Sequence, residues 1–145
     1  MKKIFLLFVS VALVGTSLIS CSSDDNGGSS SSDLVGKWYA EKTVYTFLGQ
    51  RMEQAYTHDC ATNKDYSEYK SNGGFVYGEY NSACELFEDF GTWVKNGNEL
   101  TLTQTAGGEQ TTATIVTLTS SKLVIKLSDE DTGGLMTDVE VHYKK

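Results

Sequence analysis

The sequence predicts an all-β domain: a small antiparallel up-and-down (meander) β-barrel of eight to nine strands, preceded by a signal peptide and a disordered linker. Short segments of alternating apolar and polar residues recur at a spacing of roughly 8 to 12 residues, and helical periodicity is hard to find. Gly, Asn, Asp and Ser separate these segments, because the 145-residue chain has no proline. A meander of this many strands has exposed edges unless it closes, so we favour a barrel over a two-sheet sandwich, which periodicity alone does not exclude.

The first 20 residues predict an export signal. Lys2 and Lys3 precede an apolar run from Ile4 to Val14, and small and apolar residues then lead to Cys21. This run is too short for a transmembrane helix, which needs about 20 apolar residues. An ordinary cleaved signal has no use for a cysteine directly after Leu-Ile-Ser. We therefore expect lipidation of Cys21, so that N-terminal acyl chains hold the protein to a membrane.

Residues 21–33 predict an acylated cysteine followed by a flexible Ser/Gly/Asp linker, because the segment from Asp25 to Asp33 has no apolar side chain to bury. Residues 34–145 then form one domain. Loss of Lys2 and Lys3 leaves 12 − 2 = 10 basic residues against 19 acidic ones, so the formal charge moves from −7 to −9. Such an acidic domain is not expected to bind nucleic acid, whose phosphates require clustered Lys and Arg.

The clearest strands lie near the C-terminus. Apolar residues alternate with polar ones around Ile125 and again around Val141, which predicts two strands with one face inward. The Asn96-Gly97 pair predicts a tight hairpin turn, since both residues readily take positive φ angles. The strand around Ile125 is expected to span Lys122–Ser128. The remaining strands are expected at Trp38–Phe47, Arg51–Thr57, Tyr66–Lys70, Phe75–Tyr80, Gly91–Lys95, Glu99–Thr105 and Thr111–Leu118.

Several phrases, taken in order, resemble the small lipocalin-like domain lipoproteins of Bacteroidetes. Leu34-Val-Gly-Lys-Trp38 is similar to the opening strand of that family, and Gly91-Thr-Trp93 with Asn96-Gly-Asn98 is similar to its central hairpin. The resemblance covers Leu34 to Lys145. It implies a lipocalin-like β-barrel at the outer membrane, and the run Ser22-Ser-Asp-Asp25 resembles the acidic signal that takes such lipoproteins to the cell surface. The alternative for that run is a plain acidic spacer.

The three cysteines divide by chemistry. Acylation consumes Cys21, which leaves Cys60 and Cys84 as an even pair in an oxidising compartment, so we expect a disulfide between them. His58 lies close to Cys60, but a metal site needs three or four converging ligands and a disulfide cysteine cannot act as a nucleophile. We therefore expect His58 to be a solvated loop residue.

No metal, cofactor or catalytic motif is predicted. Asp129, Asp131 and Gly133 lack the third acid and the final glutamate of a calcium loop. No nucleophile elbow, phosphate-binding loop or zinc-protease motif is present. A run of carboxylates on an acidic protein is typical of a solvated face, and this applies to Glu85, Glu88 and Asp89. The protein is therefore not expected to be an enzyme.

The abundance of aromatic residues carries the functional hypothesis. They either fill the barrel or line an apolar cup that is open at one end. We expect a monomeric, non-catalytic surface module that binds a small apolar molecule. The alternative is a solid-cored barrel that binds a protein or a glycan as an accessory or inhibitor lipoprotein. The candidate barrel or pocket aromatics are Trp38, Tyr45, Phe75, Tyr77 and Trp93.

Overall fold

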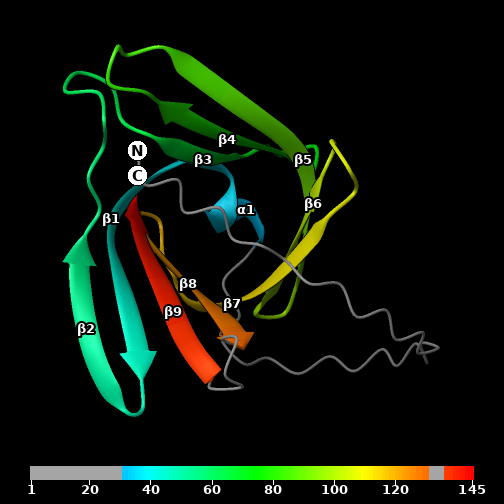
Figure 1. The fold of residues 1–145 in the computed structure, drawn as a ribbon. Coiled ribbons are helices and arrows are strands. Elements are labelled where there is room, and N and C mark those ends of the chain that lie inside the picture. Colours follow the sequence, from blue (N-terminus) through cyan, green and yellow to red (C-terminus); the bar gives the residue numbers. More distant parts are fainter. Residues whose placement is uncertain (1–30, 131–135) are drawn as a thin grey trace.

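The computed structural model describes residues 31–130 and 136–145, and these form a curved antiparallel sheet with one short helix (Figure 1). Its elements are α1 (Ser31–Leu34), β1 (Gly36–Phe47), β2 (Gln50–Ala55), β3 (Tyr66–Tyr69), β4 (Gly74–Tyr80), β5 (Leu86–Asn96), β6 (Glu99–Gln104), β7 (Gln110–Leu118), β8 (Lys122–Glu130) and β9 (Met136–Lys144).

The sheet closes into a barrel. Strands β3 to β9 pair in sequence order, and β1 completes the ring by pairing with β3 on one edge and β9 on the other. The β1–β9 contact runs from Tyr39↔Lys144 to Thr46↔Asp138. The predicted all-β, up-and-down barrel is thus confirmed as an eight-stranded ring with one additional strand, β2.

Strands β2 and β3 share one edge of β1. β3 pairs with the first residues of β1 and β2 with the last ones, so the two strands follow each other like one strand interrupted by residues 56–65 (Figure 1). The four-residue β3 covers only part of the length of β4, which continues past Gly78, the partner of Tyr66. Beyond that point, the segment 56–65 takes the place of a strand beside β4.

A bulge in β1 decides which side chains face inward. Ala40 pairs with Tyr143 and Lys42 with His142, so Glu41 is the extra residue. Simple alternation from Trp38 would place Tyr45 outside, but the bulge shifts the register by one residue and brings Tyr45 to the inner face. A second shift between Ile115 and Thr117 in β7 acts in the same way.

The buried core occupies one end of the barrel, which we term the closed end. It is the end with α1 and the turns 70–73, 97–98 and 119–121. Leu34 and Trp38 are completely buried there, and Trp38 Nε1 donates a hydrogen bond of 2.7 Å to the Leu34 carbonyl. The other members of the core are Tyr69, Leu100, Ala113, Ile115, Leu118, Leu123 and Ile125.

Two details differ from the sequence prediction. The linker was expected to extend to residue 33, yet helical structure begins at Ser31, because Leu34 anchors this turn in the core and Lys145 Nζ donates to the carbonyls of Asp33 and Val35. Strand β5 begins at Leu86 rather than Gly91, because residues 86–90 pair with residues 76–80 of β4. None of the described helices is long and apolar enough to span a membrane.

Candidate functional site

The inner wall remains accessible beyond the core. Side chains that share the inner face with Trp38 and Tyr69 are only partly buried as the barrel continues toward the turns 48–49, 81–85 and 105–109, which we term the opposite end. Six partly buried apolar residues pack against the core: Phe75, Trp93, Leu102, Leu127, Val141 and Tyr143. Phe75 and Trp93 lie beside the turn 70–73 and Tyr143 beside Leu123, all near the closed end, whereas Leu102, Leu127 and Val141 continue the wall toward the opposite end.

The five aromatic candidates occupy different depths. Trp38 is wholly buried in the closed end and Tyr45 is half-buried near the opposite end of β1. Phe75 and Trp93 both pack around Tyr69, with ring centroids 5.1 and 6.0 Å from it. Tyr77 is half-buried on the inner face, where it pairs with Ser67 and Asp89. The barrel therefore places four of these rings on partly accessible inner wall and the fifth beneath them.

A polar network borders this wall where β3 stops short. Asp65 is 4% exposed, and its carboxylate accepts hydrogen bonds from the Tyr80 backbone N–H (2.8 Å) and the Tyr56 hydroxyl (3.0 Å). The Tyr56 and Tyr77 hydroxyl oxygens lie 3.5 Å apart. A buried carboxylate is thus satisfied by two donors, and it links the segment 56–65 to β4.

The fold keeps several tyrosines in the phenol form. Burial is the largest cause in each case, and it raises the pKa of the side chain above its ordinary value of 10.0 because the phenolate would be poorly solvated. The tyrosines whose pKa is raised in this way are Tyr56, Tyr66, Tyr69, Tyr77 and Tyr143.

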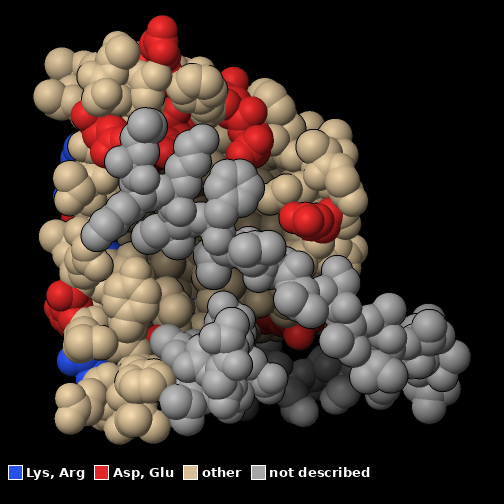
Figure 2. Space-filling view, viewed as in Figure 1, with Lys and Arg blue, Asp and Glu red and all other residues tan. Residues whose placement is uncertain are grey.

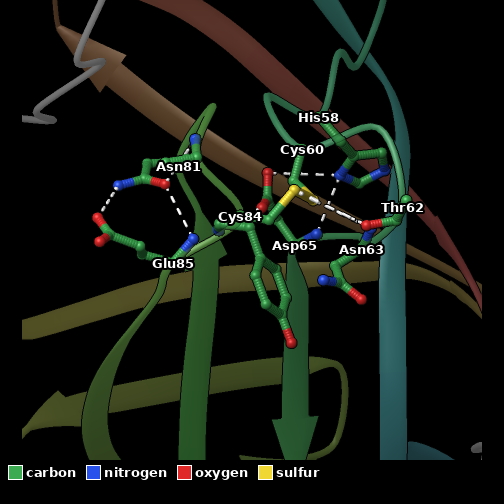
Figure 3. The surroundings of a disulfide bond; sticks show 10 residues. His58, Cys60, Thr62, Asn63, Asp65, Asn81, Cys84 and Glu85 are labelled. Atoms are coloured by element: carbon green, nitrogen blue, oxygen red, sulfur yellow. Dashed lines mark hydrogen bonds and ion pairs between the residues drawn. A yellow bond between two sulfur atoms is a disulfide. The ribbon is translucent and has the colours of Figure 1, made fainter.

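A disulfide joins Cys60 and Cys84 beside the network, with the two Cα atoms 4.9 Å apart (Figure 3). It fastens the segment 56–65 to the β4–β5 turn, so the predicted disulfide is present in the structure. Next to it, Asn81 accepts hydrogen bonds from the backbone N–H groups of Ala83 and Glu85 and donates to the Glu85 carboxylate. The bridge and these bonds together hold the part of the wall that lacks a paired strand.

The prediction for His58 is wrong. Its side chain is 16% exposed rather than solvated, and its Nδ1 accepts the Asp65 backbone N–H at 3.0 Å while lying 3.3 Å from the Asp65 carboxylate (Figure 3). Its ring also contacts Tyr56 edge-on, with centroids 5.0 Å apart. His58 is therefore a structural member of the Asp65 network, which brings together residues separated in the sequence.

Glu85, Glu88 and Asp89 are all exposed, as expected for a solvated face. Two of them also accept hydrogen bonds: Glu88, on β5, from the Tyr66 hydroxyl, and Glu85, in the turn before β5, from Asn81. In Figure 2 the Asp and Glu side chains gather where Figure 1 places β3 to β5, whereas Lys and Arg appear at the left edge. In the described part of the chain, no group of three or more His, Cys, Asp or Glu residues is placed to hold a metal ion.

Two hollows open to solvent among the described residues. One of about 330 Å³ lies on the outer face, where Tyr39, Tyr66 and Tyr80 are joined by Lys37 and residues 62–64. Lys37 Nζ stands 3.8 Å above the centre of the Tyr66 ring. The other hollow, of about 270 Å³, lies beside Phe90 and the β6–β7 turn. Cys21, Asp131 and Gly133 fall outside the described residues, as does the side chain of Asp129.

The sequence matches the lipocalin-like domain family over residues 34–125, from the buried Leu34 to Ile125 of the core. The chain belongs to this family. Its lipocalin-like barrel is similar to a lipocalin-like protein from Bacteroides uniformis, with a TM-score of 0.55 and 18% identity over 78% of this chain and 98% of that one. No curated protein matches the chain.

Two other solved structures share the lipocalin-like fold. A protein from Bacteroides eggerthii has a TM-score of 0.54 at 15% identity, covering 77% of this chain and 98% of that one. Lobster apocrustacyanin A1 has a TM-score of 0.52 at 14% identity, covering 79% of this chain and 62% of the lobster protein. At these identities the likeness concerns the fold, so the site must be interpreted from the residues of this chain.

Proposed function

We propose that this lipocalin-like protein is a non-catalytic, lipid-anchored binding protein that takes a small apolar molecule into the barrel. The observation that carries the proposal is the half-buried apolar inner wall above a closed end that is sealed by Leu34 and Trp38. Apolar side chains left accessible on a concave inner surface gain free energy when a ligand covers them.

The proposed location follows from the N-terminus. Acylation of Cys21 would tether the exported domain to the outer membrane, on the cell surface if the run after Cys21 acts as the export signal. A Cys21→Ser chain should leave the membrane fraction and lose incorporation of a labelled fatty acid. Retention in that fraction without the label would contradict lipidation as the anchor.

A matched pair of variants tests ligand binding. Thr111 and Thr112 are neighbours on β7, but Thr111 is half-buried opposite Leu102 on the inner wall, whereas Thr112 is exposed opposite Thr101 on the outer face. We expect N-phenyl-1-naphthylamine, a neutral apolar fluorophore, to bind with a blue-shifted emission. Thr111→Phe should abolish this signal by filling the interior, and Thr112→Phe should keep it. Equal binding to both variants would refute an internal site.

The outer hollow favours a second candidate function, which is binding of a glycan by the surface. Tyr39 and Tyr80 border it with half-buried aromatic side chains, and such rings pack against the C–H faces of sugars, whereas the Tyr66 ring is buried under Lys37. If that were the function, Tyr39→Ala would weaken retention on immobilised cell-wall glycan and Thr111→Phe would not.

A further inference from the structure

The inner wall carries a group of polar side chains on one face of β4 and β5, namely Tyr77, Glu79 and Asp89, which we term the notch. Tyr77, on the inner face of β4, has its hydroxyl oxygen 3.5 Å from that of Tyr56, whose hydroxyl donates to Asp65 at 3.0 Å. The Asp65 carboxylate has no proton to return, so it fixes the end of this chain of hydrogen bonds.

The direction of the chain decides what Tyr77 can offer. A phenol carries a single proton, and Tyr56 uses its own on Asp65. The proton in the 3.5 Å contact between the two hydroxyls is therefore that of Tyr77, and the Tyr77 oxygen keeps lone pairs for a further donor. Hydrogen bonds aligned in this way polarise one another, and this strengthens the terminal oxygen as an acceptor.

The charges around Tyr77 have one sign. Asp89 is its cross-strand partner on β5, and Glu79 follows two residues later on the same face of β4. Burial is the main cause that raises the pKa of Tyr77; the hydrogen bond with Tyr56 lowers it in part, and the negative charges of Glu79, Asp65 and Asp89 raise it further. Glu79 and Asp89 are both exposed, and they lie on the parts of β4 and β5 that lead to the turn 81–85 at the opposite end of the barrel.

We propose that the barrel selects an apolar amine, whose ammonium group donates to the Tyr77 oxygen between Asp89 and Glu79 while its hydrocarbon part covers the inner wall. This inference rests on the proposed function and specifies its ligand class. An ammonium supplies the donor and the positive charge that the notch accepts. A carboxylate of the same length meets lone pairs and two negative charges, so apolar acids are rejected.

Three ligands with the same hydrocarbon chain test the inference: dodecylamine, dodecanol and dodecanoic acid. The affinity of each ligand is measured by how well it displaces N-phenyl-1-naphthylamine from the Cys21→Ser protein. This substitution leaves every described residue unchanged. We expect dodecylamine to bind at least about tenfold more tightly than dodecanoic acid, with dodecanol between them. Added salt should lower the affinity for dodecylamine and leave the affinity for dodecanol unchanged, because salt screens only the attraction between the ammonium and the carboxylates.

Variants assign the effect to the notch. Asp89→Asn should lower the affinity for dodecylamine several-fold and leave the affinity for dodecanol unchanged. Tyr77→Phe should lower the affinity for both ligands, since it removes the acceptor. The control is Glu99→Gln, which removes one exposed carboxylate at the closed end and should change neither affinity. Circular dichroism verifies that each variant retains its sheet structure.

Two results overturn the inference in different ways. If the fluorophore binds but dodecanoic acid competes as well as dodecylamine, or Asp89→Asn leaves amine affinity unchanged, the amine selectivity is wrong and the apolar site stands. If neither the fluorophore nor any of the three ligands binds, the proposed function fails and the ligand class fails with it.

Discussion

Removing the Cys60–Cys84 disulfide provides the most quantitative test of how the barrel wall is held. The two cysteines are 24 positions apart. A closed loop of about 25 residues restricts the unfolded chain by an entropy that corresponds to about 3.5 kcal/mol at 25 °C. That free energy changes the unfolding equilibrium constant roughly 300-fold, and it is a large part of the net stability of a small domain.

The perturbation is a double variant, Cys60→Ala with Cys84→Ala, unfolded in urea and followed by tryptophan fluorescence and circular dichroism. We expect the free energy of unfolding to fall by about 3.5 kcal/mol. Cys84 has a φ angle of 61°, a conformation that costs a residue with a Cβ about 1 kcal/mol. Pairing Cys60→Ala with Cys84→Gly should therefore recover part of the loss. A loss below about 1 kcal/mol for the alanine pair would refute the reasoning.

Three further predictions follow from single contacts and from titration. Gly91→Ala would drive a Cβ into the backbone carbonyl of Thr103, so we expect a loss of about 1 to 3 kcal/mol in urea unfolding, and an unchanged midpoint would contradict that close approach. Trp38→Phe deprives the Leu34 carbonyl of its donor and should cost about 1 to 3 kcal/mol by the same assay, whereas a neutral effect would show that water replaces the bond. The tyrosines with a raised pKa contribute stability that is fully present below pH 10.0, the pKa of an unfolded tyrosine. Above that pH the unfolded chain loses protons that the folded protein retains, so the free energy of unfolding should fall as the pH rises. Full tyrosinate absorbance at an undiminished circular dichroism signal would contradict this.

The sequence was sufficient for the parts of the fold that depend on local pattern. Alternation around Ile125 and Val141 correctly predicted two strands with their apolar residues inward. The hairpin at Gly97 was also predicted, but its turn residues are Gly97 and Asn98, and Gly97 takes a positive φ of 59° whereas Asn96 does not, because it still pairs with Glu99. The closure of β1 against β9 was predicted from the need to remove exposed edges. These features are determined by the period of the strand and by turn chemistry.

The parts that escaped prediction depend on residues brought together by the fold. Tyr45 was among the candidate barrel aromatics, but the bulge at Glu41 that brings it to the inner face has no local signature in the sequence. The burial of His58 requires Asp65, and the direction of the Tyr77 hydroxyl requires Tyr56. A buried aspartate next to a disulfide loop carries no signature in the sequence, because its partners come from two separate places, the segment 56–65 and the end of β4.

Nuclear Overhauser contacts between bound N-phenyl-1-naphthylamine and the side chains of the labelled protein decide whether the ligand lies inside the barrel. We expect contacts from the fluorophore to Leu102, Leu127 and Val141 on the inner wall. Contacts confined to exposed outer residues such as Val94 and Val116 would contradict it.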